Sequence, residues 1–291
     1  MSSRSSGGVS RLSPYLQVAP LALIMLAMVG IPIGTVILLS FWESDGIAVF
    51  PTFTWQNYAE VLTSPLTLTL FLNTLKYALI TLAATILIGF TCSYFLVFHV
   101  RNLKWQIGLF LLCTIPFWTS NVIRMVSWIP FLGREGLFNQ LLIGAGVIDQ
   151  PLDVLLYSDF AVVLTYIHLF TLFMIVPIFN SMSKINPSLI EAARDAGASP
   201  WQILTGVIIP LSKTGIALGA IFVVTLVMGD FFVVRVMSGG QSASVVSAMK
   251  NNIDQLFYPV ASAMAVLLVV VVLMMVAAIL RVVDIRSELA R

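Results

Sequence analysis

The sequence predicts an all-α integral membrane protein with six transmembrane helices. Of its 291 residues, 59% are hydrophobic and 10% are charged, and the mean hydropathy is +1.01. A soluble domain carries about 25% charged residues, so this chain has too few charges to cover a surface that faces water. Several apolar runs reach the length of about 20 residues that a helix needs to cross a bilayer. Because only helices and closed barrels satisfy their backbone groups in lipid, such unbroken runs indicate helices.

Six apolar runs are long enough to be spans. The first is too long for the core of a signal peptide and is followed by no A-x-A-like cleavage site, so we interpret it as a retained helix. The predicted spans are Val18–Phe41, Tyr77–Phe98, Gln106–Trp128, Ala161–Phe179, Thr214–Val236 and Pro259–Val283. We expect one transmembrane domain over residues 15–285, with short polar tails at 1–14 and 286–291.

The distribution of Lys and Arg predicts that both termini lie in the cytoplasm. Positive residues gather in cytoplasmic loops, and ten of the fifteen fall on the side that carries both chain ends. These ten are Arg4, Arg11, Arg101, Lys104, Lys184, Arg194, Lys213, Arg281, Arg286 and Arg291. The five on the other side are Lys76, Arg124, Arg134, Arg235 and Lys250.

Several function classes are disfavoured. The net charge is +2 and no basic tract is present, which argues against nucleic-acid binding. Cys92 and Cys113 fall inside apolar runs without metal-ligand spacing, so we expect small buried side chains. The sequence has no H-E-x-x-H cluster and no serine or cysteine with an identifiable base beside it, so a membrane enzyme is disfavoured.

The longest predicted cytoplasmic segment, residues 181–213, has the pattern of two short helices. Asn186 followed by Pro187 is a helix start, Gly197 is a stop, and Ser199-Pro200 repeats the start signal. We expect Pro210 to end or bend the second helix before the fifth span. In the first helix, one side carries Leu189, Ile190, Ala193 and Ala196, and the other carries Glu191, Arg194 and Asp195. An amphipathic helix resting on lipid headgroups would show the same pattern.

The residues of this segment favour a more specific reading. Glu191-Ala192-Ala193, then Gly197-Ala198, and a hydrophobic pair before Pro210 resemble the EAA loop of binding-protein-dependent importer permeases. Further segments resemble the spermidine/putrescine branch of that family. They are Asn73-Thr74, the stretch 115–120, the stretch 229–232 and the stretch 258–263.

The resemblance implies a function and a set of partners. The EAA loop would be a coupling helix that sits in a groove of a cytoplasmic ATPase and transmits its closure to the bundle. A second related permease chain, an ATPase dimer and a periplasmic solute-binding protein would complete the importer in the bacterial inner membrane. The chain has no Gly-Lys dipeptide and therefore no P-loop, so the partner ATPase would bind ATP and Mg, and this chain no cofactor.

Ionisable residues near the spans are the candidates for the solute path, because a charge in lipid is costly unless it faces water or a partner. Asp230 is the first, since its carboxylate with Phe231, Phe232 and Trp118 would suit the ammonium groups of a polyamine. Arg124 and Trp128 are the second. Asp230 could instead form an ion pair with Arg124 or Arg235, Trp128 could anchor the chain at the interface, and Lys76 could reach outward to water.

Two alternatives concern the solute and the energy source. Arg124 and Arg235 lie at a depth similar to Asp230 and would repel a polycation unless paired, which leaves room for a carboxylate-bearing amino-acid derivative. An ion-coupled secondary transporter would need ligands at midplane, for which Asp230 and His168 are weak candidates. In the fifth span, Gly215 and Gly219 have the G-x-x-x-G spacing, which serves static helix packing or gating.

Overall fold

The computed structural model describes residues 13–283, with side chains from Val18 onward, and consists mainly of helices. The predicted tails at 1–14 and 286–291 lie outside these residues, except that Ser13 and Pro14 already belong to helix α1. Cys92 and Cys113 are free and partly buried.

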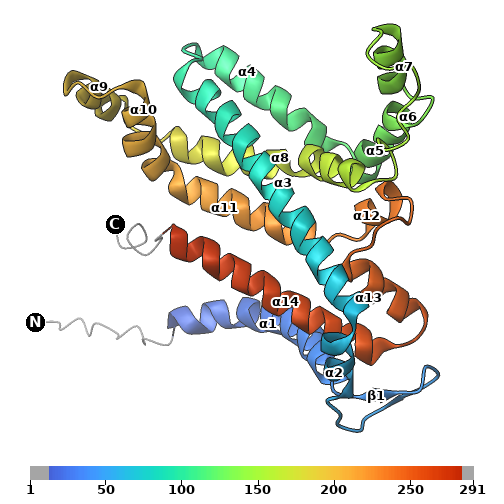
Figure 1. Cartoon of the computed structure of the whole chain (residues 1–291). Helices are drawn as coiled ribbons and strands as arrows, with labels where there is room; N and C mark the ends of the chain where they lie inside the picture. Colours follow the sequence, from blue (N-terminus) through green and yellow to red (C-terminus); the bar gives the residue numbers. More distant parts are fainter. Residues whose placement is uncertain (1–12, 284–291) are drawn as a thin grey trace, which may run out of the picture.

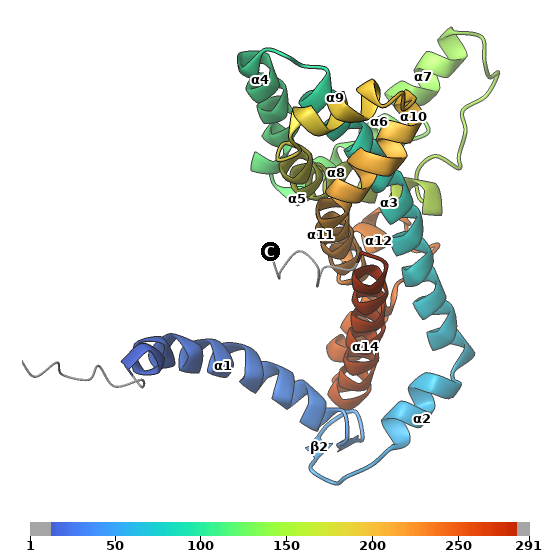
Figure 2. The ribbon, with the colours of Figure 1, turned by 90° about the vertical axis from the view of Figure 1, so that its left-hand side faces the viewer.

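Three long helices form the centre of the molecule. Helices α3 (Pro65–Phe98), α8 (Asp159–Met182) and α11 (Ile209–Met228) pack against one another, and α14 (Tyr258–Val282) packs against α11 (Figure 1). Helix α1 (Ser13–Leu39) contacts α14 and otherwise leans away from the bundle (Figure 2). No residue of its most apolar stretch is buried, so α1 presents nearly its whole circumference to its surroundings.

Shorter elements join the long helices. A hairpin of two antiparallel strands pairs Glu43 with Phe50. The shorter elements are β1 (Glu43–Ser44) and β2 (Val49–Phe50), which form this hairpin, and the helices α2 (Gln56–Thr63), α12 (Phe232–Met237) and α13 (Val245–Asp254). Helix α3 begins at Pro65 rather than at Tyr77, because Ser64 caps it by accepting a hydrogen bond from the Thr67 amide at 3.4 Å.

The predicted third span is broken, and the prediction of one helix over Gln106–Trp128 is wrong in its second half. The segments on the two sides of residues 119–120 are inclined at 93° to each other. Pro116 lies in the turn that ends the first segment, and Ser120 caps the next one through the Val122 amide at 3.3 Å. The elements are α4 (Leu103–Thr114), the 3₁₀ turn η1 (Ile115–Trp118), α5 (Asn121–Val126), α6 (Trp128–Leu132) and α7 (Leu137–Gly144).

The described residues therefore contain five helices long and apolar enough to cross a membrane, or six if the bent pair counts as one span. The apolar run hid the break, because hydropathy does not register a cap or a proline inside a continuous apolar stretch.

The predicted fifth span differs at both ends. Pro210 does not end a helix: α9 (Pro187–Asp195) is followed by a continuous helical stretch over Pro200–Met228. This stretch consists of α10 (Pro200–Ile203), the π-helical turn η2 (Leu204–Ile208) and α11. The wider turn directly before Pro210 accommodates a residue that lacks an N–H group and whose ring would clash in a regular helix.

At its other end α11 stops at Met228, so residues up to Val236 do not continue the span as predicted. The Asp230 side chain accepts a hydrogen bond from the Val233 amide at 2.8 Å, and α12 starts there as a separate helix. An aspartate that caps a new helix competes with continuation of the old one.

The G-x-x-x-G glycines of α11 serve close packing against α8. A Cβ atom on Gly215 would lie 2.4 Å from the Pro177 carbonyl oxygen, and one on Gly219 would lie 2.6 Å from the Met174 sulfur. At Gly215 the close neighbour is backbone, so only glycine fits there, whereas at Gly219 a larger residue would require the Met174 side chain to shift.

The bundle has two distinct ends (Figure 1). Helices α9 and α10 lie at one end, together with the last turn of α14 and the first turn of α1. The hairpin, α2, α5–α7, α12 and α13 lie at the other. We refer to these as the α9 end and the α13 end.

Candidate functional site

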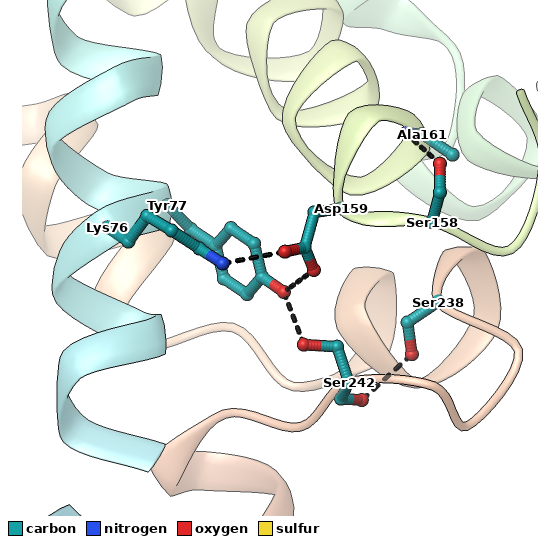
Figure 3. Close-up of polar contacts among 7 residues, drawn as sticks. All are labelled: Lys76, Tyr77, Ser158, Asp159, Ala161, Ser238 and Ser242. Carbon is teal, nitrogen blue, oxygen red and sulfur yellow. Dashed lines mark hydrogen bonds and ion pairs between the residues drawn. The ribbon is translucent and has the colours of Figure 1, made fainter. Parts of the chain in front are cut away.

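A polar cluster at the α13 end joins three segments that are far apart in the sequence (Figure 3). We call it the Asp159 cluster; it consists of Lys76, Tyr77, Asp159 and Ser242. The Lys76 ammonium lies 2.6 Å from Asp159 Oδ2, and the Tyr77 hydroxyl donates a hydrogen bond to Asp159 Oδ1. Ser242 Oγ lies 2.6 Å from the Tyr77 hydroxyl oxygen. Since the phenolic proton goes to Asp159, Ser242 is the donor in that contact.

Two hydrogen bonds beside the cluster position the elements that carry it. Ser158 caps α8 by accepting from the Ala161 amide at 3.2 Å, so Asp159 occupies the first turn, where the helix dipole favours a carboxylate. The Val245 amide donates to Thr74 Oγ1 at 3.0 Å and thereby ties the start of α13 to α3.

Burial differs within the Asp159 cluster. Tyr77 is 1% exposed, whereas the side chains of Lys76 and Asp159 are 41% and 48% exposed. The Lys76 ammonium also lies 5.1 Å from the centre of the Tyr77 ring, within cation–π range. The arrangement can bind an alkylammonium group through a carboxylate and an aromatic ring, close to the surface.

Sequence reasoning missed this cluster. It treated Lys76 as a side chain that reaches outward to water, and it did not consider Tyr77, Asp159 or Ser242. The available signal was a charged residue at the start of two predicted spans, Lys76 and Asp159, with opposite charges at a similar predicted depth.

Asp230, the first candidate for the solute path, lies beside this cluster and has no ionic partner among the described residues. Its Oδ1 accepts hydrogen bonds from the Tyr166 hydroxyl at 3.2 Å and from the Val233 amide at 2.8 Å. None of the three ion pairs within residues 18–283 includes it, so pairing with Arg124 or Arg235 is not the arrangement found.

The electrostatics of Asp230 follow from its position just beyond the end of α11. Burial raises the pKa of the Asp230 carboxyl, and the hydrogen bonds from Val233 and Tyr166 oppose this rise. The Tyr166 ring lies 6.5 Å from the Tyr77 ring, so two tyrosines connect Asp230 with the Asp159 cluster.

Arg124 and Trp128 lie together on the segment that follows the break. Arg124 is 6% exposed; its Nη2 donates to Asn121 Oδ1, and its Nε has no partner among the described residues. The Trp128 indole donates to His168 Nδ1 at 2.9 Å. His168 is therefore hydrogen-bonded in the packing, and Trp128 is tied to α8 rather than acting only as a surface anchor.

The predicted aromatic group around Asp230 is only partly assembled. Phe231 and Phe232 have ring centres 6.2 Å apart. Trp118, however, is 85% exposed and lines a different, apolar hollow of about 410 Å³ with Phe117, Phe173 and Phe222. None of the ring contacts within residues 18–283 joins Trp118 to Phe231 or Phe232.

The predicted helix–turn–helix forms the α9 end. The Asn186 side chain caps α9 through the Ser188 amide at 3.1 Å, and Gly197 has a φ of +82°. Ser199 and Gln202 form a reciprocal capping box at the start of α10. These features agree with the start and stop signals in the sequence.

The exposure of the loop departs from the predicted two-sided pattern. Ile190 and Ala193 pack against the core, but Leu189 is 49% exposed and Ala196 is also exposed. Glu191, Ala192 and Trp201 are exposed, and Ala198 is partly buried. A hollow of about 440 Å³ separates this loop from the end of α3; among its lining residues are Tyr94, His99, Arg194 and Ala198. The loop therefore presents apolar and acidic side chains outward at the tip of the molecule.

Comparison with known proteins decides the family. Residues 109–287 match the family described as binding-protein-dependent transport system inner membrane component. The chain belongs to this family. It is a permease subunit of an ATP-binding-cassette importer, a multi-pass inner-membrane protein and not itself an enzyme. Because the chain belongs to a family of ATP-driven importer permeases, the alternative of an ion-coupled secondary transporter is no longer needed.

Relatives and solved structures agree with this assignment. The spermidine/putrescine transport system permease protein PotB of Salmonella typhimurium is 34% identical over 208 residues, which cover 72% of this chain and 71% of that protein. PotB of Haemophilus influenzae is 31% identical over 239 residues, covering 81% and 82%.

Two solved structures share the fold. A chain of a bacterial alginate ABC transporter, in complex with alginate pentasaccharide-bound periplasmic protein, has a TM-score of 0.72, 16% identity and 91% coverage of both chains. A chain of the inward-facing MetNI methionine ABC transporter has a TM-score of 0.53 and 19% identity, covering 76% of this chain and 98% of that one.

Proposed function

We propose that this permease moves a polyamine such as spermidine or putrescine from an external binding protein into the cytoplasm. The observation that carries the proposal is its similarity, at 31–34% identity over most of the chain, to permeases named for spermidine/putrescine transport. The carboxylates Asp159 and Asp230 with tyrosines beside them, at one end of the bundle, support a cationic solute.

The orientation follows the positive-inside rule. The α9 end faces the cytoplasm, with both termini on that side, and the α13 end faces the periplasm. A loaded binding protein docks on the α13 end, where the hairpin, α2 and α13 offer a broad surface. Of the solute-path residues proposed from the sequence, Asp230, Phe231 and Phe232 line the route from that end. Arg124 and Trp128 support it from the segment that follows the break, and Trp118 lines the separate apolar hollow.

The α9 loop is the coupling element. A partner ATPase, which binds ATP and Mg, contacts the exposed Glu191 and Ala192. The shape of this contact depends on Ala193, Gly197, Ala198 and Pro210. A second, related permease chain completes the transmembrane pathway as a heterodimer. Alternating access then results when closure of the ATPase dimer moves α9 and, through the continuous Pro200–Met228 stretch, α11.

A valine at Gly197 tests the coupling. The chain is co-expressed with its neighbouring genes and purified with its ATPase in mild detergent. Gly197 has a φ of +82° with open space around it, so Gly197→Val strains the backbone without a clash. We expect uptake of labelled putrescine in liposomes to fall about tenfold or more while the chain still folds, because distortion at the docking contact breaks transmission.

Gly146→Val is the matched control. Gly146 has a φ of +69° and open space as well, but it lies after α7 at the opposite end. Equal loss of uptake in both variants would show that the effect is general strain, and unchanged uptake in Gly197→Val would contradict the coupling role.

A carboxylate-bearing amino-acid derivative is the second candidate solute. The buried Arg124 guanidinium, whose Nε has no partner among the described residues, favours it, since an uncompensated buried cation attracts an anion. Direct uptake separates the two: labelled putrescine is taken up, and excess spermidine competes with it, under the first proposal, whereas a labelled amino acid is taken up under the second.

A further inference from the structure

We propose that Asp159, Tyr77 and Ser242 form a binding subsite for an ammonium group of the solute, and that Lys76 occupies this subsite when solute is absent. The inference rests on the proposed polyamine function and adds to it the residues that receive the solute at the α13 end.

The occupant of the subsite has the chemistry of the solute. A lysine side chain carries a primary ammonium at the end of a stem of about four carbons, and putrescine carries the same group at each end of a four-carbon chain. Lys76 meets Asp159 at 2.6 Å and lies 5.1 Å from the Tyr77 ring centre. A site that holds this group from its own chain has the geometry to hold it from a ligand.

The receiving side of the subsite is preformed. Tyr77 is buried, and its hydroxyl is fixed between Asp159 on α8 and Ser242 on the segment before α13. Ser238 Oγ in turn donates to the Ser242 carbonyl at 2.9 Å (Figure 3). Carboxylate and ring therefore keep their positions whether or not Lys76 is in place, and binding needs little reorganisation.

The Lys76 ammonium can be exchanged for the ammonium group of a ligand. The Lys76 and Asp159 side chains are about half exposed, and an ion pair at such exposure adds little net stability because water screens it. An incoming ammonium can displace Lys76 at low cost, and Lys76 can turn outward to water through its flexible stem.

Displacement of Lys76 from Asp159 also explains how the bound solute can be released. Once the solute ammonium lies on Asp159, the Lys76 charge is left nearby and repels it. Lys76 therefore limits how tightly the subsite retains a polyamine, which suits a site that must pass its ligand onward. Asp230 accepts a hydrogen bond from Tyr166, whose ring lies 6.5 Å from the Tyr77 ring, and its carboxylate can receive a second ammonium group of the same solute.

The test measures binding of labelled putrescine to the purified transporter complex without binding protein, by equilibrium dialysis. Asp159→Asn keeps the hydrogen-bonding shape and removes the charge, and we expect putrescine to bind about tenfold or more weakly, as for loss of a charge-assisted hydrogen bond. Lys76→Gln removes the competing ammonium, and we expect binding at least about threefold tighter with slower turnover of uptake.

An ion pair on α13 provides the control. Lys250 and Asp254 are 39% and 51% exposed, close to the 41% and 48% of Lys76 and Asp159, and lie at the same end. Lys250→Gln and Asp254→Asn should leave putrescine binding unchanged, because no aromatic ring or buried hydroxyl accompanies that pair among the described contacts.

The outcomes separate the two proposals. If wild type takes up polyamine but Asp159→Asn binds it normally, or if Lys76→Gln weakens binding as much as Asp159→Asn does, the subsite is overturned and the function stands. If wild type takes up no polyamine, the proposed function fails and the subsite fails with it. Should Asp159→Asn not fold, tighter binding by Lys76→Gln still supports the subsite and unchanged binding refutes it.

Discussion

The two ends of the molecule are built in different ways. The α9 loop is held mainly by contacts within a few residues: Asn186 with Ser188, and Ser199 with Gln202. The Asp159 cluster joins residues 83 and 165 positions apart, Lys76 with Asp159 and Tyr77 with Ser242. A locally built element can move as a unit against a partner, whereas a cluster that crosslinks three segments fixes their relative positions. The difference fits a loop that transmits movement at one end and a preformed polar site at the other.

The largest effect is expected at Gly215, where α11 packs closely against α8. In Gly215→Leu the new side chain would meet the Pro177 carbonyl and the Ser181 side chain, with Cβ contacts of 2.4 and 2.5 Å. Overpacking of this size forces α11 away from α8, and we expect no folded protein by size-exclusion chromatography in detergent. Gly108→Leu, at an exposed position where nothing lies within 4 Å of the new Cβ, should elute as wild type; if both variants fold, the α8–α11 contact is looser than described.

A smaller effect is expected from the hydroxyl at the centre of the Asp159 cluster. Tyr77→Phe leaves the ring in place but removes the bonds to Asp159 and Ser242. Loss of buried hydrogen bonds of this kind costs about 1–3 kcal/mol, so the thermal unfolding midpoint in detergent should fall. Tyr58→Phe, which removes a hydroxyl that pairs with Ser40 Oγ in the described part of the chain, is the control and should lower the midpoint less. An unchanged midpoint in Tyr77→Phe would mean that the three segments hold together without this crosslink.

The smallest effect is expected at the α9 end. Asn186→Ala removes the cap of α9, worth about 1 kcal/mol of helix stability. Because α9 packs mainly against α10, the loss should stay local. Hydrogen exchange in peptides covering residues 187–195 should quicken while the global unfolding midpoint stays constant. Ser188→Ala keeps the amide that the cap binds and serves as the control. A fall of the global midpoint in Asn186→Ala would show that the loop is not the independent unit described above.

Much of the fold could be predicted from the sequence. The membrane class followed from composition, and four of the long helices, α1, α3, α8 and α14, cover the predicted spans almost fully. The caps at Asn186 and Ser199 and the positive φ at Gly197 were readable because they depend on neighbours within four residues. Breaks at Ser120 and at Asp230 carried similar capping signals, yet the continuous apolar runs around them concealed both.

Only the tertiary structure decided the polar contacts of the candidate site. From the sequence, Asp230 could pair with Arg124 or Arg235 and Lys76 with water; in the folded chain Asp230 lies on Tyr166, and Lys76 lies on Asp159. Likewise Trp118 lines a separate hollow, because the predicted third span is bent at residues 119–120. Hydropathy and capping are local properties that the sequence carries by itself. Which charge meets which depends on how α3, α8 and α11 pack, and that packing is set by side-chain volumes and glycine contacts summed over the whole bundle.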